Sequence, residues 1–193
     1  MKIGVDLDGV VFDSEKLFRI YCEIYEVNDL KRNSIIDNRE LMFQTRYNWT
    51  EEEKEQFFEN NLEEIIANSN FMPGARKVLK LLKESGHQLF VITARGSGNP
   101  KSIEITKNIF EKHNIKFFDE YFWAVKDKAK KCKEEKIDLM IDDSPDNCKK
   151  IAENKIDVIY LKDAPSYEIN ENDYIQTLYN WGEIYRYIKE KYE

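Results

Sequence analysis

Cysteine is scarce in this sequence, and its cysteines do not form obvious pairs. Cys22, Cys132 and Cys148 are odd in number, lie far apart and form no CxxC motif, which argues against both a disulfide framework and a zinc site. They are typical of reduced thiols. The sequence also has no signal-peptide pattern and no apolar run as long as a membrane span. We therefore expect a cytoplasmic protein with no membrane partner.

The sequence has no excess of positive charge. Its 30 basic and 37 acidic side chains give a formal net charge of −7, so no overall positive field attracts a polyanion, and we expect no nucleic acid polymer as a partner. Any phosphate group must be bound by a few local residues. With 41% hydrophobic residues, the 193-residue chain is long enough for one globular domain that carries a small insertion.

Short apolar runs alternate along the chain with amphipathic helical segments. The runs, typical of strands buried on both faces of a parallel sheet, lie at residues 3–5, 89–93, 121–125, 137–141 and 157–161. Helices are predicted at residues 73–86, 99–114, 127–136 and 144–155, and near the end of the chain at 180–192. This repeated β-α-β pattern predicts an α/β fold with a doubly wound, parallel-sheet, Rossmann-like core.

One interval breaks this pattern. Roughly sixty residues separate the first strand from the next core helix, far more than a usual βα loop contains. Residues 14–27 and 50–67 have the pattern of amphipathic helices, and the second has Thr50 at its N-cap with Glu53 three positions later. The sequence predicts a core domain of residues 1–13 and 73–193, with residues 14–72 inserted after the first strand as a small helical cap.

Polar residues gather where the predicted strands end, which is where open α/β sheets bind ligands. In strand order these residues are Asp6 and Asp8, then Thr93, then Lys126 and Lys128, then Asp142 and Asp143. Four carboxylates at one edge of a sheet repel one another unless a cation lies among them. Oxygen ligands without His or Cys favour Mg²⁺. The sequence therefore predicts a Mg²⁺ site, with one aspartate left for chemistry.

These motifs together resemble the haloacid dehalogenase (HAD) superfamily of phosphohydrolases. The resemblance rests on "DLDGV" after the first strand, "VITAR" at the end of the next, a lysine before "IDLMIDDSPDN", and a helical insertion directly after the first motif. Each motif is short, but the four occur in this order and each lies at a predicted strand end. The resemblance implies Mg²⁺-dependent hydrolysis of a phosphomonoester.

The resemblance also implies a role for each motif. Asp6 is expected to attack phosphorus and form an aspartyl-phosphate, and Asp8 to act as the acid and base. Gly9 leaves room for a close backbone turn. Thr93 is expected to donate a hydrogen bond to the phosphoryl oxygens. Mg²⁺ is expected to bind Asp6, the carbonyl of Asp8, Asp142 and Asp143.

A lysine is expected to neutralise the charge of the transferred phosphoryl group. Five lysines lie close together in this stretch, at positions 126, 128, 130, 131 and 133. We favour Lys128 because it falls at the start of the helix after the third strand. The later lysines have the spacing of a solvated helical face.

Within the superfamily, the sequence most resembles the branch of 5'-nucleotidases and 5'(3')-deoxyribonucleotidases, which hydrolyse nucleoside monophosphates. In that branch the residues after the motif threonine help to bind phosphate, so Ala94 and Arg95 become candidates, although binding of the adjacent loop would explain Arg95 equally well. Phe12, Phe43, Tyr47 and Trp49 are candidates for contact with a nucleobase, although packing within the cap would also explain them. The expected substrate is a small nucleotide.

Three other interpretations remain open. The same core residues would serve a phosphatase for another small phosphomonoester, such as a sugar phosphate. A receiver domain also combines acidic residues, a threonine and a lysine around Mg²⁺, but its phosphorylated aspartate follows the third strand, where this sequence has "AVKDK". A non-catalytic HAD-like binding protein would have no need for four crowded carboxylates. The oligomeric state is left open.

Overall fold

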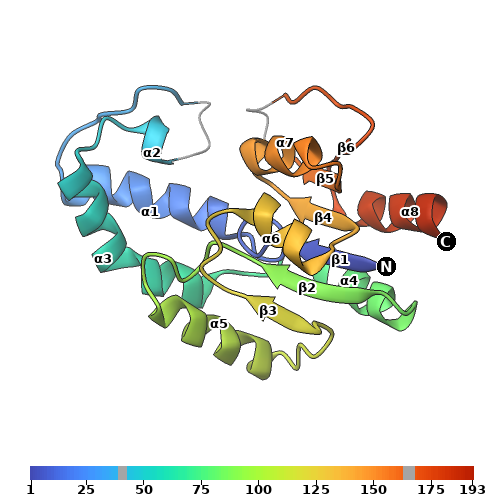
Figure 1. Ribbon diagram of the computed structural model, residues 1–193. Coiled ribbons are helices and arrows are strands. Elements are labelled where there is room, and N and C mark those ends of the chain that lie inside the picture. Colours follow the sequence, from blue (N-terminus) through green and yellow to red (C-terminus); the bar gives the residue numbers. More distant parts are fainter. Residues whose placement is uncertain (39–42, 163–167) are drawn as a thin grey trace.

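Six parallel strands form one sheet at the centre of the molecule (Figure 1). The computed structural model describes residues 1–38, 43–162 and 168–193, and the strands are counted within these ranges. They are β1 (Lys2–Val5), β2 (Gln88–Ile92), β3 (Glu120–Phe122), β4 (Leu139–Asp142), β5 (Asp157–Leu161) and β6 (Ile175–Leu178). Their order is β3-β2-β1-β4-β5-β6. The order reverses between β1 and β4, and such a switch point is where open α/β sheets bind ligands.

Helices cover both faces of this sheet. They are α4 (Ala75–Glu84), α5 (Lys101–Lys112) and α8 (Trp181–Tyr192) on one face, and α6 (Lys128–Glu135) and α7 (Pro145–Glu153) on the other. Alternate residues of a strand point to opposite faces, so Val91 packs with the first group and Phe90 with the second. Burial on both faces explains the continuous apolar runs. The predicted doubly wound α/β fold is confirmed.

Strand β5 has the predicted bounds and β1 and β2 differ from them by one residue, whereas larger differences occur at β3, β4 and β6. The strand expected at 121–125 ends at Phe122, because Ala124 adopts a positive φ of 56° that extended backbone does not allow. The strand expected at 137–141 extends to Asp142. The sixth strand, Ile175–Leu178, was not predicted, because it is short, lies at the edge of the sheet and has only its end residues buried.

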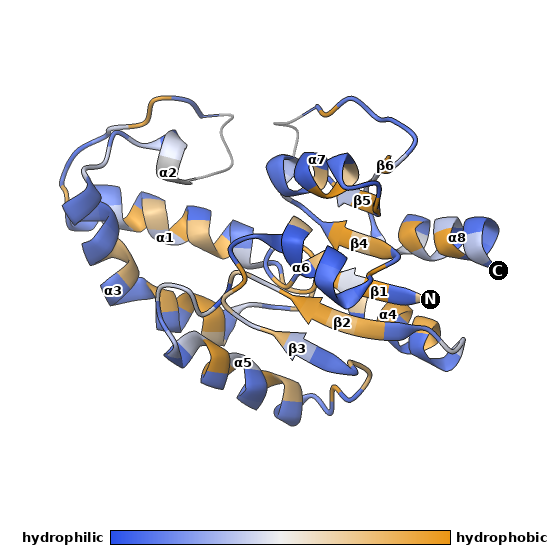
Figure 2. Cartoon of the chain, viewed as in Figure 1, coloured by the Kyte–Doolittle hydropathy of each residue, from blue (hydrophilic) through white to orange (hydrophobic). Residues whose placement is uncertain are grey.

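In its described part, the inserted segment contains three helices with an apolar cluster of their own. They are α1 (Ser14–Asn28), α2 (Phe43–Arg46) and α3 (Glu51–Asn68). Thr50 caps α3 in a capping box with Glu53, as the sequence predicts. The buried members of the cluster are Phe18, Cys22, Tyr25, Tyr47, Trp49, Phe57 and Ile65. Figure 2 shows the hydrophobic bands of α1 and α3 apart from the hydrophobic strands of the sheet. Among the described residues, no helix combines the length and apolar character needed to cross a membrane.

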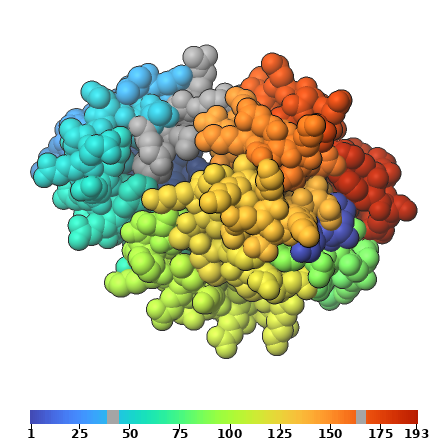
Figure 3. All heavy atoms as spheres, viewed as in Figure 1, coloured from blue at the N-terminus to red at the C-terminus, as the bar shows by residue number. Residues whose placement is uncertain are grey.

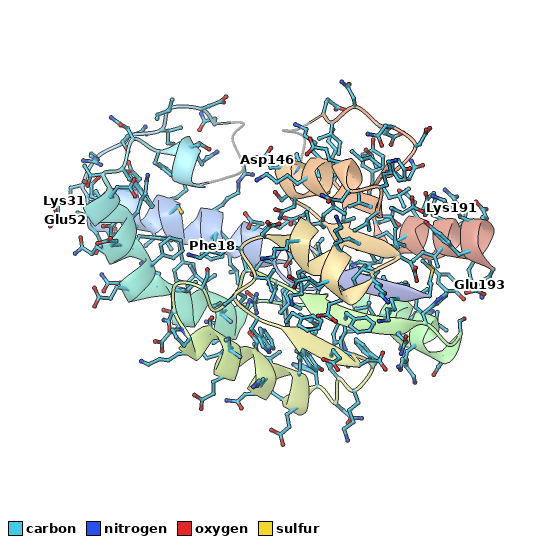
Figure 4. All side chains as sticks on the ribbon, viewed as in Figure 1. Phe18, Lys31, Glu52, Asp146, Lys191 and Glu193 are labelled. Carbon is cyan, nitrogen blue, oxygen red and sulfur yellow. The ribbon has the colours of Figure 1, made fainter. Side chains whose placement is uncertain are left out.

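The inserted helices lie beside the carboxyl ends of the strands. The arrowheads of the sheet point toward α1 and α3 in Figure 1, and the insertion forms a blue-to-teal mass on that side in Figure 3. Glu63 of α3 forms an ion pair with Lys101 at 3.1 Å, at the start of α5. Figure 4 marks Phe18 on α1, the helix that begins directly after the loop of Asp8. Ligands bound at the strand ends would therefore lie between sheet and insertion.

Candidate active site

Two buried carboxylates and one buried lysine form the centre of the candidate site. Asp6 directly follows β1, and Asp142 ends β4, the neighbouring strand. Nζ of Lys128 lies 2.6 Å from Oδ2 of Asp6 and 2.6 Å from Oδ2 of Asp142. Burial lowers the pKa of Lys128, but the charges of the two aspartates outweigh it and raise the pKa above its usual range. Of the five candidate lysines, Lys128 is the buried one.

A third carboxylate, Asp143, completes an acidic cluster at this point. Asp6, Asp142 and Asp143 each place one ligand oxygen within 4.8 Å of the others. Burial raises the pKa of Asp6 to about 6, although the charge of Lys128 opposes the shift. Burial, and next the charge of Asp142, raise the pKa of Asp143 well above its usual range. Without a further cation, the cluster therefore disfavours full ionisation.

The donor atoms of this cluster fit a small divalent cation. Oδ1 of Asp6 is buried and has no hydrogen-bond partner in the described part of the chain. A buried, unpaired carboxylate oxygen is unfavourable unless an ion or ligand meets it. The cluster consists of carboxylates without His or Cys, and these are the ligands that Mg²⁺ prefers. The residues present could therefore hold Mg²⁺.

Gly9 brings the loop after β1 close to this cluster. Its φ is +70°, and a Cβ atom at this position would lie 2.0 Å from Oδ2 of Asp143. We expect Gly9→Ala to displace Asp143, to destabilise the fold by about 1–3 kcal/mol and to weaken any rise in Tm caused by Mg²⁺. Thermal denaturation with and without Mg²⁺ measures both effects.

Gly98→Ala is the matched control for this prediction. Gly98 has no atom within 4 Å of an added Cβ, and its φ is not in the left-handed region. We expect this variant to stay within about 0.5 kcal/mol of the wild type. A Gly9→Ala protein with the stability and Mg²⁺ response of the control would contradict the close approach of Gly9 to Asp143.

The side chain of Asp8 is held by hydrogen bonds from two directions. Arg95, in the loop after β2, donates from Nε to Oδ2 at 3.1 Å and from Nη2 to Oδ1. Ser14, the first residue of α1, donates from Oγ to Oδ1 at 2.6 Å. Burial raises the pKa of Asp8, but the charge and hydrogen bonds of Arg95 outweigh burial and hold the pKa below its usual range. Of the two roles that the sequence leaves open for Arg95, binding of phosphate and binding of an adjacent loop, these contacts with Asp8 correspond to the second.

Thr93 lies at the carboxyl end of β2, and its backbone is hydrogen-bonded to the end of β3 and the residues that follow it. Its N–H donates to the carbonyl of Phe122 at 3.1 Å, and its carbonyl accepts from the N–H of Val125 at 2.8 Å. The Thr93 hydroxyl oxygen accepts the backbone N–H of Arg95 at 3.2 Å. The side chain is buried, whereas Ala94 is exposed at the strand end. Among the residues that the structure describes, the Thr93 hydroxyl has no acceptor for its hydrogen, which is therefore available to a ligand.

Comparison with known proteins places this geometry in a family. Residues 1–192 match the family described as "5' nucleotidase, deoxy (Pyrimidine), cytosolic type C protein". The chain belongs to this nucleotidase family. Its predicted membership of the HAD superfamily is confirmed, and so is its predicted class, a hydrolase of phosphoric monoester bonds.

Individual relatives agree with that family assignment. The chain is 26% identical over 189 residues to "Putative nucleotidase BH1399" of Halalkalibacterium halodurans, covering 98% of this chain and 93% of the relative. It is 26% identical over 196 residues to "Putative 5'(3')-deoxyribonucleotidase" of Chlorobaculum tepidum, covering 97% and 89%. A HAD-like hydrolase of Streptococcus pneumoniae shares the fold, with a TM-score of 0.72, 17% identity and 97% of each chain covered.

The aromatic candidates have packing roles. Phe12 is fully buried, with its ring centroid 4.9 Å from that of Phe71. Tyr47 and Trp49 stack on each other at 4.8 Å inside the cap cluster, and both are at least 95% buried. These three residues are therefore not retained as substrate contacts. The side chain of Phe43 lies outside the part of the chain that the structure describes.

Three further residues join the site without having been predicted. Asn147 of α7 donates from Nδ2 to Oδ1 of Asp142 at 3.1 Å. Ser14 binds Asp8, and its neighbour Glu15 has a pKa raised to about 7 by burial and by the charges of Asp8 and Asp6. Ser14 and Glu15 directly follow the loop of the first motif, and this proximity is the signal that could have identified them. The sequence analysis assigned both to the cap alone.

Proposed function

We propose that this chain is a Mg²⁺-dependent nucleotidase that hydrolyses nucleoside or deoxynucleoside monophosphates through an aspartyl-phosphate on Asp6. The observation that carries the proposal is the position of Asp6. It lies at the switch point of the sheet, its Oδ2 is held 2.6 Å from Lys128, and its Oδ1 is buried with no hydrogen-bond partner among the described residues. A fixed carboxylate with one unengaged oxygen suits a nucleophile.

In the first step, Oδ1 of Asp6 forms a bond to phosphorus while the bond from phosphorus to the leaving oxygen breaks. Asp8, protonated for this step, transfers its proton to that leaving oxygen. The two residues are separated by one position, and an extended chain returns alternate side chains to the same side. The products are the free alcohol of the substrate and the phosphorylated enzyme.

In the second step, a water oxygen forms a bond to phosphorus while the bond between phosphorus and Asp6 breaks. The Asp8 carboxylate takes the proton that this water loses. The electron pair of the broken bond returns to Asp6, and inorganic phosphate is released. Asp8 ends this step protonated, which is the form that the next first step requires.

The remaining site residues stabilise the phosphoryl group as its charge shifts. Lys128 brings a positive charge to the nucleophile, and Thr93 has a hydroxyl hydrogen that can donate to a phosphoryl oxygen. Mg²⁺, held by Asp6, Asp142, Asp143 and the carbonyl of Asp8, would supply further charge neutralisation. Asn147 and Ser144 both donate to Asp142 and so fix its orientation.

The helical insertion, residues 14–72, is proposed as a cap that selects the leaving group. Its helix α1 begins next to Asp8, the residue that protonates the leaving oxygen in this mechanism. Support for a nucleotide substrate comes from the family match and from the relative named "Putative 5'(3')-deoxyribonucleotidase". We also propose a cytoplasmic location, in line with the word "cytosolic" in the family description.

The proposed substrate class is tested by phosphate release with Mg²⁺ from ribonucleoside and deoxyribonucleoside monophosphates and from sugar phosphates. We expect kcat/KM for at least one nucleotide to exceed that for every sugar phosphate by tenfold or more. A higher kcat/KM for a sugar phosphate would agree with the proposed chemistry but would refute the assignment of a nucleotide substrate. A protein that hydrolyses none of them would refute the proposal as a whole.

The raised carboxylate pKa values predict an unusual dependence of stability on pH. In the metal-free protein, Asp6 has a pKa of about 6, above the value of about 3.9 for an unfolded chain. Between these values the folded state binds more protons than the unfolded state, so stability rises as pH falls from about 7 to 5. Asp143 and Glu15 act in the same direction. Asp8, with a lowered pKa, contributes stability that is lost only below about pH 4.

Mg²⁺ is expected to remove this dependence, because it favours the ionised carboxylates. The measurement is Tm between pH 5 and 7, in EDTA and in excess Mg²⁺. We expect Tm in EDTA to increase toward pH 5 and the stabilisation by Mg²⁺ to be largest at pH 7. Equal pH profiles with and without Mg²⁺ would count against the metal site.

A further inference from the structure

All three nitrogen atoms of the Arg95 guanidinium group donate hydrogen bonds. Its Nε and Nη2 donate to the two oxygens of Asp8, and its Nη1 donates to Oγ1 of Thr106 at 2.8 Å. Thr106, in turn, donates to the carbonyl of Ser102 at 2.7 Å, so the acceptor itself is fixed within α5. The guanidinium carbon lies 4.9 Å from the ring centroid of Phe12. The position of Arg95 is therefore set on several sides.

The exposure of these groups indicates which of them meets a substrate. The side chain of Arg95 is 2% exposed, whereas that of Asp8 is 30% exposed. Asp8 is therefore the more accessible of the two groups. A phosphate group that entered from solvent would meet Asp8 first, and Arg95 could reach it only by giving up bonds that Asp8 needs.

We propose that Arg95 is a positioning residue that holds the Asp8 carboxylate ready to accept a proton from water. The proposal rests on the proposed function, and it concerns the second step, in which water attacks the aspartyl-phosphate. Both oxygens of Asp8 accept from one planar fork, a geometry that fixes the plane of the carboxyl group and favours its ionised form, the form in which it takes a proton from water. Ser14 adds a third bond from the first residue of α1 and links this orientation to the inserted helices.

The two possible roles of Arg95 predict different kinetics. If Arg95 only orients the base, its removal slows the loss of phosphate from Asp6. Phosphate binding is unchanged, and so is the first step when the leaving group needs no proton. In that case kcat and KM fall together and kcat/KM is preserved. A residue that binds phosphate directly affects capture of the substrate, so kcat/KM falls.

The test uses Arg95→Met with p-nitrophenyl phosphate, whose leaving group departs readily without a proton. We expect kcat to fall between about 10- and 100-fold, with kcat/KM within threefold of the wild type and with a burst of p-nitrophenol equal to the enzyme concentration. Arg95→Lys retains the charge but not the fork and is expected to give the same pattern. Thr106→Val keeps the arginine and removes its third acceptor, and we expect a smaller fall in kcat, about threefold or more.

Arg76→Met is the matched control, because Arg76 is exposed and its guanidinium stacks on Phe71 at 5.1 Å in the manner of Arg95 on Phe12. We expect it to retain wild-type kinetics. Calorimetric binding of inorganic phosphate with Mg²⁺ gives a second readout that needs no turnover. The proposal expects Arg95→Met to bind phosphate within twofold of the wild type.

A tenfold loss of phosphate affinity, or an equal loss of kcat/KM and kcat in both Arg95→Met and Arg95→Lys, would overturn the positioning role in favour of direct phosphate binding. Failure of the proposed function has a different signature. In that case the wild type releases no p-nitrophenol, while phosphate binding still reports whether Arg95 takes part in anion binding.

Discussion

Asp6→Asn is expected to reduce kcat for phosphate release by about 10⁴-fold or more. An amide is nearly the same size as a carboxylate, but its oxygen is not a competent nucleophile toward phosphorus, so the covalent route is lost. The amide oxygen can still accept a hydrogen bond from Lys128, which lies 2.6 Å from Oδ2 of Asp6. Removing one of several crowded, buried carboxylates is not expected to unfold the protein. The measurement is kcat with Mg²⁺ and the best substrate found.

Asp146→Asn provides the control for this substitution. Asp146 is an exposed aspartate in the first turn of α7, marked in Figure 4, and it is not one of the three carboxylates of the acidic cluster. Its replacement makes the same chemical change close to the site, and we expect kcat within about threefold of the wild type. If Asp6→Asn and Asp146→Asn have similar rates, Asp6 is not the nucleophile.

Lys128→Met is expected to lower both stability and activity. The Lys128 side chain is 4% exposed, and its ammonium group is the shared partner of Asp6 and Asp142, whose side chains are 9% and 0% exposed. Removing one partner of a buried ion pair leaves uncompensated charge in the interior and costs about 3–5 kcal/mol. We also expect kcat to fall by about 10²–10³-fold, because the charge near the transferred phosphoryl group is lost. Denaturant unfolding and kcat measure the two effects.

Lys130→Met tests the same change two residues further along α6. The side chain of Lys130 is 73% exposed and its only ion-pair partner among the described residues is Glu134, at 4.0 Å. We expect its removal to change stability by no more than about 0.5 kcal/mol.

Excess Mg²⁺ would offset part of the repulsion between the carboxylates that Lys128→Met leaves behind. It should therefore stabilise the Lys128→Met protein more than the wild type. If Lys128→Met and Lys130→Met changed stability and kcat equally, Lys128 would have no special role in the site.

The candidate site residues at the strand ends could be predicted from the sequence. Parallel strands place their carboxyl ends at one edge, so a polar residue directly after an apolar run can be assigned to that edge without knowing the strand order. This reasoning identified Asp6, Asp142, Asp143 and Thr93. It also selected Lys128, because the start of a helix that follows a strand lies at the same edge. The order of the strands then brings β1 and β4 together.

Side-chain direction beyond the strand ends could not be predicted in the same way. Arg95 turns toward Asp8 because the chain bends sharply there, with the N–H of Ser97 donating to the carbonyl of Ala94 and with Gly96 at a φ of +100°. A sequence motif identifies the residue but not this bend. Tyr47 and Trp49 lie outside the cap helices predicted at residues 14–27 and 50–67, so no helical periodicity indicated that they pack inside the cap.

The most direct test of the account is to trap the covalent intermediate. The wild-type protein with Mg²⁺ and its best substrate is quenched in acid during turnover and treated with borohydride, which reduces an aspartyl-phosphate to homoserine. Peptide mass spectrometry then locates the reduced residue. The account predicts the homoserine mass at position 6, with no reduction in samples quenched before substrate is added. Reduction at another aspartate, or none in a protein that is turning over, would contradict the assignment of Asp6 as the nucleophile.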